Sequence, residues 1–304
     1  MGLISGAIDA ALESIGKSLL DVGEWFLETG YTLWKNAGKL TLDYVKISPM
    51  SQSGAWGVVT GSVYQMSLAI AASLAVLFFV MGWLRESIDI RNNFTLENMF
   101  RFFVRYAITA SLIVNSLSLV TGICECATAV TSQISVNMES KDVENVFETV
   151  RDQLEDDDDA DGGTWIGMGL AGMLGGFFGG AVIMVCGVSL VLSVLSRLFK
   201  LLLCVPFAPA AFAGFAGGHE FAQTGIAWLR TFIGYALEAV VIALAISISY
   251  GMFKDANIFS AGAKSGSIVS LLLLICGYCM PMVTACACVK GAEMTVRRCL
   301  GLGL

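Results

Sequence analysis

The chain is poor in charge. Only 14% of its 304 residues are Asp, Glu, Lys or Arg, and it holds one His and four Pro. A soluble domain carries about 25% charged residues. The hydrophobic share is 56%, the mean hydropathy is +0.74, and runs of about 20 apolar residues are long enough to cross a bilayer. The composition therefore indicates a membrane protein.

Enzyme and cofactor motifs are absent from the sequence. We find no nucleophile–base set, Gly-rich nucleotide loop or zinc-protease motif. The pair Cys276 and Cys279 has redox or zinc spacing, but it lies in an apolar segment without a nearby His. No Lys/Arg-rich patch of the kind that binds phosphates occurs. We therefore predict no enzyme, no cofactor and no metal.

The other cysteines and the N-terminus add little chemistry. Seven of the nine Cys lie in or beside apolar segments, where Cys usually behaves as a small hydrophobe. Cys124 and Cys126 are too close in sequence for an unstrained disulfide, so we interpret them as free thiols. The first basic residue is Lys17, whereas a signal peptide carries its basic residues before the apolar core.

Five long apolar segments predict five spanning helices, over 63–84, 102–123, 165–196, 226–253 and 268–289. The expected fold is an all-α polytopic membrane helix bundle. We divide the chain into N-terminal helices over 1–50 and a transmembrane domain over 51–304, since Pro49 interrupts the helical pattern between them.

Charge orients these spans. Eleven of the 25 acidic residues fall within 139–161, whereas basic residues concentrate in alternate gaps between spans. Lys and Arg mark the cytoplasmic side, which predicts an outside N-terminus and a cytoplasmic C-terminus. The loop over 124–164 would face outward as a solvated linker. The aspartate run 156–159 lacks the spacing of a calcium loop. Binding of a divalent cation by these carboxylates is the alternative to a solvated linker.

The N-terminal region is amphipathic over 2–28, and a second helical segment covers 31–45. Apolar residues recur every three or four positions, opposite a mainly acidic face. A helix that binds membranes by electrostatics is usually basic, so we expect this stripe to pack on protein or on itself in an oligomer. A helix lying in the membrane interface is the alternative. The packing candidates are Ile4, Ile8, Leu12, Ile15 and Leu19.

Glycines four apart mark the third span, at Gly172, Gly176 and Gly180. Residues without side chains let two helices approach closely in lipid. This face could serve packing within the chain, an interface between subunits or the wall of a conduit.

Helix breakers follow the third span, and a few charges lie inside spans. Pro and Gly residues predict a re-entrant or interfacial cytoplasmic bend over 204–222. Glu238 lies deep in the fourth span as a functional candidate, or as a buried acid paired with Ser or Arg. Arg101 and Arg105 either snorkel to headgroups or face a polar conduit. The bend residues are Pro206, Pro209, Gly217 and Gly218.

The layout resembles the TrbL-like family of polytopic channel subunits in type IV secretion and conjugation machines. The resemblance rests on the opening Met1-Gly2-Leu3-Ile4-Ser5-Gly6, the amphipathic N-terminal helices, and Pro206-Phe207-Ala208-Pro209 followed by Gly214 and Gly217-Gly218. It is closest to short members from Gram-positive mobile elements. The resemblance implies a homo-oligomeric channel component in the lipid bilayer, working with other secretion-system subunits and ATPases on a transient DNA or protein substrate.

Two other functions remain open on the sequence. One is a small-solute transporter or ion channel with Glu238 as its coupling residue, although no inverted repeat or set of paired intramembrane charges is visible. The other is a membrane scaffold of another complex.

Overall fold

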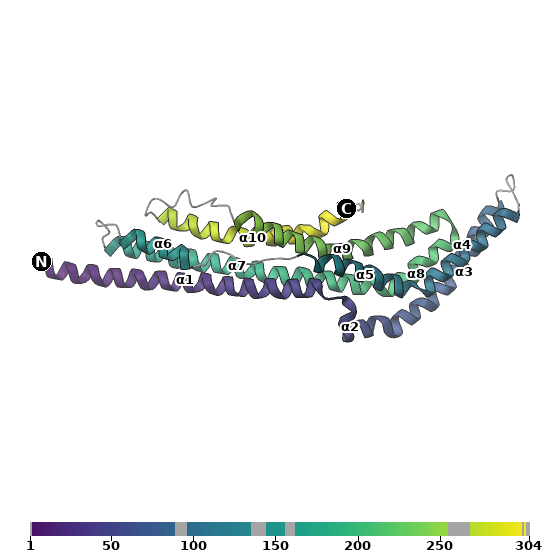
Figure 1. Ribbon diagram of the computed structural model, residues 1–304, viewed down its shortest axis with the longest axis horizontal. Coiled ribbons are helices and arrows are strands. Elements are labelled where there is room, and N and C mark those ends of the chain that lie inside the picture. Colours follow the sequence, from purple (N-terminus) through teal and green to yellow (C-terminus); the bar gives the residue numbers. More distant parts are fainter. Residues whose placement is uncertain are drawn as a thin grey trace. The chain divides into compact units, whose positions relative to one another are not determined.

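The computed structural model describes residues 2–88, 96–134, 144–155, 162–254, 268–299 and 301. Helices dominate this part of the chain, and no strand occurs in it (Figure 1). In chain order the elements are α1 (Gly2–Lys46), η1 (Pro49–Ser51), α2 (Ser53–Val58), η2 (Val59–Val63), α3 (Tyr64–Ile88), α4 (Leu96–Val114), α5 (Ser116–Ser132), α6 (Glu144–Glu155), α7 (Gly162–Cys204), η3 (Val205–Phe207), α8 (Ala208–Ala213), η4 (Gly214–Gly217), α9 (His219–Lys254) and α10 (Ile268–Cys299).

Four helical stretches of the described chain are long and apolar enough to cross a membrane: Ser53–Arg85, Gly162–Gly217, His219–Ser249 and Ile268–Cys299. The helix pair Phe100–Val114 and Ser116–Ser132 passes the same test together, with a bend of 63° between its members. These findings confirm an all-α, multi-pass membrane helix bundle with four spans, or five if the bent pair crosses once.

The bend falls at Asn115, within the expected span over 102–123. Asn115 has non-helical dihedrals (φ −94, ψ 10), and its Nδ2 donates to the Ser111 carbonyl over 2.9 Å. The Ser116 hydroxyl donates to the Ile113 carbonyl over 2.8 Å. Asn and Ser side chains compete with the backbone for hydrogen bonds and bend helices. One continuous span here is therefore replaced by α4 and α5.

The N-terminal region is one helix, α1, rather than separate segments over 2–28 and 31–45. Gly30, which lies between those segments, is buried against α7 and does not interrupt the helix. The predicted break at Pro49 is confirmed, because α1 ends at Lys46 and Pro49 begins the short helix η1.

The predicted loop over 124–164 is largely helical where the structure describes it. The helix α5 continues to Ser132, and α6 occupies Glu144–Glu155. Phe147 and Val150 of α6 are fully buried, at 0% and 1% exposure. The acidic composition concealed this apolar pair, which is spaced for one face of a helix. The aspartate run over 156–159 lies outside the described residues.

The predicted bend over 204–222 is a helical hairpin with its reversal at Gly218. Pro206 and Pro209 occupy the first turns of η3 and α8, where a missing backbone N–H costs nothing. Gly218 has φ 97 and ψ −170, and α9 begins at the next residue. Because side chains exclude that backbone conformation, glycine rather than proline turns the chain.

The helices pack as two compact units. Unit 1 comprises 1–43, 134–193 and 243–291, and unit 2 comprises 44–133, 194–242 and 292–304. The helices α1, α7, α9 and α10 each contribute to both. This division differs from the predicted split near residue 50, because most of α1 packs with parts of the transmembrane helices.

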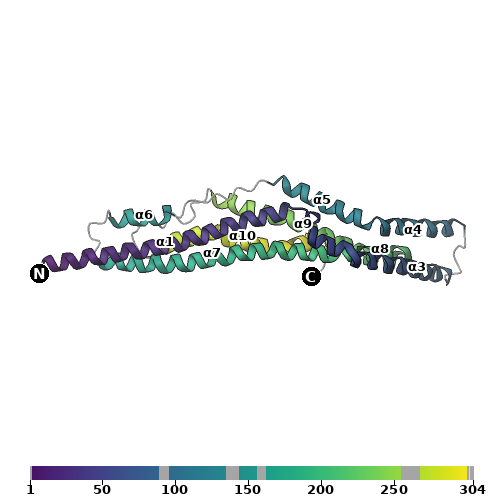
Figure 2. The same cartoon turned by 90° about the horizontal axis from the view of Figure 1, so that it is seen from below.

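In unit 1, α1 and α7 lie side by side and run in the same direction (Figures 1 and 2). An added Cβ at Gly16 would meet Trp165, and one at Gly30 would meet Gly180, so residue numbers rise together along both helices. The 43 residues of α7 are about 64 Å long at 1.5 Å per residue. A bilayer core is about 30 Å thick, so α7 is roughly twice the length of one perpendicular crossing.

In unit 2, α3 packs against the arm of the hairpin that contains α8 and η4. An added Cβ at Gly82 of α3 would lie 2.8 Å from the Gly217 carbonyl oxygen, which shows how closely these backbones approach. Behind them, Trp228 stacks on Phe232 with ring centroids 5.2 Å apart and donates its indole N–H to the Cys204 carbonyl over 3.3 Å. Phe232 belongs to the buried core of unit 2, and Trp228 packs against that core.

Candidate functional sites

The contact between α1 and α7 is a glycine seam. Gly16, Gly23 and Gly30 lie seven residues apart on α1 and are buried. An added Cβ would lie 2.5 Å from the Trp165 carbonyl oxygen at Gly16 and 2.7 Å from the Gly180 carbonyl oxygen at Gly30. Backbone therefore packs directly on backbone. A seven-residue repeat keeps one helix face turned toward its partner along a left-handed supercoil.

The predicted glycines Gly172, Gly176 and Gly180 all lie in this seam. An added Cβ at Gly176 would meet the backbone of Gly23, and one at Gly180 would meet the Phe26 carbonyl oxygen at 2.5 Å. At Gly172 it would meet the Leu20 side chain. Of the three uses considered for this face, packing within the chain is therefore the one that the structure contains.

The apolar stripe predicted on α1 is not its buried face. Ile8 and Ile15 are 53% and 51% exposed, Leu12 and Leu19 are half-buried, and the side chain of Ile4 lies outside the described set. The buried positions alternate Gly with larger residues because the close approach to α7 needs both. They are Gly16, Leu20, Gly23, Leu27, Gly30, Trp34 and Gly38, followed by Thr41 and Val45.

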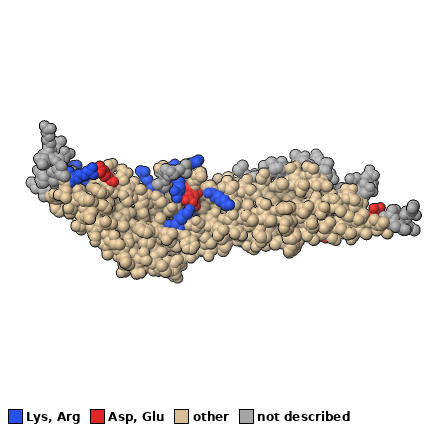
Figure 3. Space-filling model, turned by 180° about the vertical axis from the view of Figure 1, so that it is seen from behind, with Lys and Arg blue, Asp and Glu red and all other residues tan. Residues whose placement is uncertain are grey.

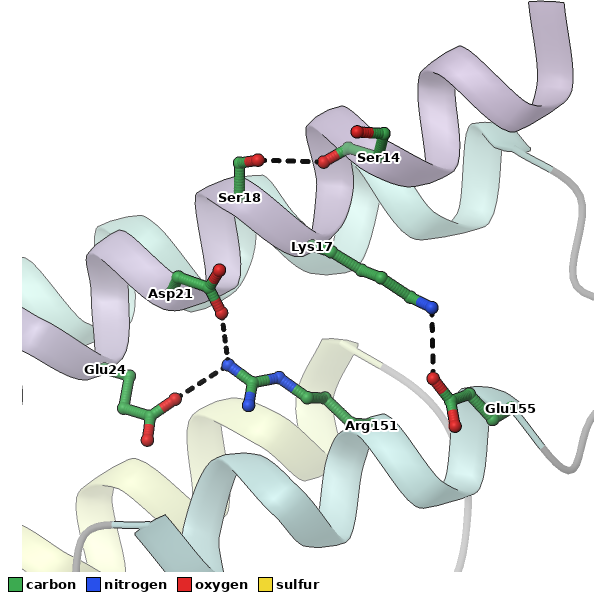
Figure 4. A network of polar contacts seen from close by, with 7 residues as sticks. All are labelled: Ser14, Lys17, Ser18, Asp21, Glu24, Arg151 and Glu155. Atoms are coloured by element: carbon green, nitrogen blue, oxygen red, sulfur yellow. Dashed lines mark hydrogen bonds and ion pairs between the residues drawn. The ribbon is translucent and has the colours of Figure 1, made fainter. Parts of the chain in front are cut away.

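Ion pairs attach α6 to the polar face of α1 (Figure 4). Arg151 of α6 donates from Nη2 to the carboxylates of Asp21 and Glu24, the latter over 2.8 Å. Lys17 lies 3.0 Å from both Glu13 and Glu155. Hydrogen bonds to these two carboxylates raise the pKa of Lys17. The basic residues of α1 and α6 thus hold two mainly acidic helices together.

Unit 2 contains a second charged cluster, built by α7, α9 and α10. Arg197 is 5% exposed and donates from Nε to the Tyr235 carbonyl over 2.9 Å. Lys200 pairs with one oxygen of Glu293, and Arg297 pairs with the other over 2.9 Å. Figure 3 shows that such charged side chains gather in a few places on an otherwise uncharged face. Ionisable groups within membrane helices are costly and usually functional.

Glu238 belongs to this cluster and is 6% exposed. It lines a cavity of about 160 Å³ between α9 and α10, and its Oε2 accepts no hydrogen bond from the described residues. The sequence left open a buried acid paired with Ser or Arg, but Oε2 of Glu238 lacks a hydrogen-bond partner in the described part of the chain. The cavity is lined by Thr231, Gly234, Tyr235, Glu238, Glu293, Val296 and Arg297.

The two arginines predicted near the second span lie apart from this cluster. Arg101 is exposed, and the guanidinium of Arg105 lies 5.4 Å from the ring centroid of Phe102. An added Cβ at Gly218 would lie 3.3 Å from Nη1 of Arg105, so this arginine reaches the tip of the hairpin. Beside the tip, Arg85 pairs with Glu220.

Sequence reasoning missed the functional grouping of several residues. The heptad Gly16, Gly23 and Gly30 was visible as a seven-residue spacing. Lys200 and Arg297 are among the basic residues that predict the orientation of the spans, and nothing in that pattern brings them together. Glu293 and Arg297 are nevertheless spaced for a helical ion pair. In the described part of the chain, all nine Cys are free thiols, and no group of three or more His, Cys, Asp or Glu could hold a metal ion.

The chain matches no protein-family model, no curated protein and no solved structure.

Proposed function

We propose that the protein is a subunit of an oligomeric membrane conduit in a type IV secretion or conjugation machine. One observation carries the proposal: a helix with a continuous charged face is packed lengthwise on a membrane-spanning helix. The expected setting is a bacterial inner membrane, with the N-terminus outside and the C-terminus cytoplasmic. Separate ATPases would supply energy for a DNA or protein substrate.

The surface of α1 carries three faces. The glycine seam is covered by α7, and beside it lies an exposed apolar stripe. The remaining face is charged along the same length of helix; α6 binds it at Lys17, Asp21 and Glu24, and it is exposed farther along the helix. The apolar stripe contains Ile8, Ile15, Val22, Leu33 and Leu40, and the charged face contains Glu13, Lys17, Asp21, Glu24, Glu28, Lys35 and Lys39.

These faces require different surroundings. A charged side chain at the bilayer centre costs about 2.5–3.5 kcal/mol on an insertion scale, so several in a row need water. Large exposed apolar residues need lipid or another protein surface. Several copies of α1 arranged around a water-filled conduit satisfy both, with the charges that α6 leaves uncovered toward the water and the apolar stripes toward neighbouring subunits. The seam runs along the glycine-rich part of α7, so α1 lies beside that span in unit 1.

The experiment tests the exposed stripe without touching the seam. Ile15→Asp places a charge on the stripe, and Thr32→Asp places the same charge on the polar face as the control. We expect Ile15→Asp to reduce oligomer size in detergent, measured by light scattering, and to lower transfer frequency from the native element. Thr32→Asp should leave both unchanged. Equal behaviour of the two variants would contradict the oligomeric conduit.

The machine itself is tested separately. Co-purification with an assembly ATPase, and gene neighbours that encode a relaxase and a coupling ATPase, are expected for a conjugation subunit. Unchanged transfer after deletion of the gene, in a strain with an otherwise complete transfer region, would contradict the secretion role. It would not contradict the oligomer, which the previous experiment tests.

A second function is favoured by Glu238 alone. Its unpartnered oxygen in a cavity between membrane helices suits a small-solute transporter or ion channel with Glu238 as the coupling residue. That function predicts transport by the purified protein in liposomes, without an ATPase, and loss of transport in Glu238→Gln.

A further inference from the structure

Glu238 lines the cavity between α9 and α10, and its buried Oε2 is an acceptor that nothing in the described chain satisfies. Glu238 is only 6% exposed, and its Oε2 has no hydrogen-bond partner among the described residues. A buried polar atom without a partner is costly. The volume of about 160 Å³ leaves room for several water molecules or a small organic group. The cavity therefore has both the space and the need for a donor.

The same cavity also presents unused donors. Arg297 makes its hydrogen bonds to described residues through Nη2, to Glu293 over 2.9 Å and to the Tyr235 hydroxyl over 3.3 Å. Its Nη1 and Nε remain available, and the side chain is 39% exposed. Glu293 is already paired at both carboxylate oxygens, with Lys200 and Arg297. An anionic group entering the cavity would thus meet Arg297, whereas Glu293 is already neutralised by two cations and attracts a further cation weakly.

Charge decides between the classes of ligand. With both carboxylates ionised, the three cations Arg197, Lys200 and Arg297 leave one excess positive charge over Glu238 and Glu293. A free cation would add to that excess. A free anion would leave Glu238 without a donor. A ligand that carries both charges satisfies Oε2 of Glu238 and the free nitrogens of Arg297 without changing the net charge.

We propose that this cavity binds a small zwitterion with a primary ammonium group and an anionic oxygen group. The ammonium donates to the carboxylate of Glu238, whose buried Oε2 turns toward the cavity to accept it, and the anionic group accepts from Nη1 and Nε of Arg297. Two sources carry this chemistry: the headgroup of a zwitterionic aminophospholipid, and a free small molecule such as an amino acid or phosphoethanolamine. The site is independent of the secretion role, since it lies within unit 2 and involves no residue of the glycine seam.

The test uses the purified full-length protein in detergent, titrated with O-phosphoethanolamine, glycine, ethanolamine and inorganic phosphate. We expect either zwitterion to bind more tightly than ethanolamine or phosphate. Glu238→Gln keeps the shape and should weaken zwitterion binding roughly 10- to 100-fold, the effect of one lost charge-assisted hydrogen bond. Glu220→Gln, on the same helix but outside the cavity, is the matched control and should bind as wild type.

A second arm distinguishes the sources. The protein is reconstituted in nanodiscs of equal phosphatidylethanolamine and phosphatidylglycerol, and lipids retained after extraction are identified by native mass spectrometry. Preferential retention of phosphatidylethanolamine, lost in Glu238→Gln, assigns the headgroup. Binding of soluble zwitterions without such retention assigns the free molecule.

Several results would overturn the site. Equal binding of ethanolamine would make it a plain cation site, and equal binding of phosphate a plain anion site. Thr231→Met fills the cavity without altering its charge and should also abolish binding. Either of two results would reject the proposal. One is undiminished binding in folded Glu238→Gln and Thr231→Met, and the other is no binding of any probe.

Discussion

Replacing Gly23 by Ala tests whether the seam between α1 and α7 holds unit 1 together. The added Cβ would lie 2.7 Å from the Gly172 carbonyl carbon and 2.9 Å from the Met173 nitrogen. Both are backbone atoms, so no side chain can rotate away. Because the Gly172 carbonyl oxygen lies closer still, an ordinary contact of 3.4 Å requires the helices to separate locally by more than about 0.7 Å. Overpacking of this kind costs about 1–3 kcal/mol.

Gly6→Ala is the matched control because Gly6 lies on the same helix with nothing within 4 Å of its added Cβ. Ala stabilises an unhindered helical position by about 0.4–1 kcal/mol relative to Gly. That gain applies in part to Gly23 as well, so the difference between the two variants isolates the overpacking cost. We expect Gly6→Ala to be neutral or stabilising and Gly23→Ala to be destabilising.

The assay is reversible unfolding of the purified protein in mixed micelles, followed by tryptophan fluorescence. Trp34 is fully buried at the end of the seam and reports on its opening. Gly176→Ala meets the same backbone from the other side, so the double variant should cost less than the sum of the single ones. Equal effects of Gly6→Ala and Gly23→Ala, or full additivity in the double variant, would refute direct backbone packing at this position.

Three further predictions concern α6, the hairpin and topology. Arg151→Met should release α6 and speed limited proteolysis there, whereas Asp152→Asn should not; the loss is about 1 kcal/mol, since the ion pairs are partly exposed. Gly218→Ala should destabilise the protein by about 1–3 kcal/mol, measured by the same unfolding assay, because φ 97 with ψ −170 is nearly restricted to glycine; Gly251→Ala, in open space, should not. Reporter fusions should place the two termini on opposite membrane sides if the bent pair α4–α5 crosses once, and on the same side if it does not cross.

The sequence was sufficient for the class of fold. Continuous apolar runs over 63–84, 165–196, 226–253 and 268–289 coincide with the four long spans, the third to within a few residues at its end, because only a helix satisfies every backbone polar group within its own segment in lipid. The same reasoning failed at Asn115, since one polar residue in an apolar run barely alters hydropathy. It also failed at α6, where acidic residues conceal the buried Phe147 and Val150.

The sites depended on which helix lies beside which. Glycine spacing predicted close packing at Gly172, Gly176 and Gly180, but only the tertiary structure identified α1 as the partner helix and Gly23 as a contact. Likewise, Glu238, Glu293 and Arg297 stand far apart or on separate helices in sequence, and their cluster exists because α9 packs against α10. Sequence periodicity determines which face of a helix is apolar, small or charged. Packing decides what each face meets, because close approach depends on the shapes of two surfaces rather than one.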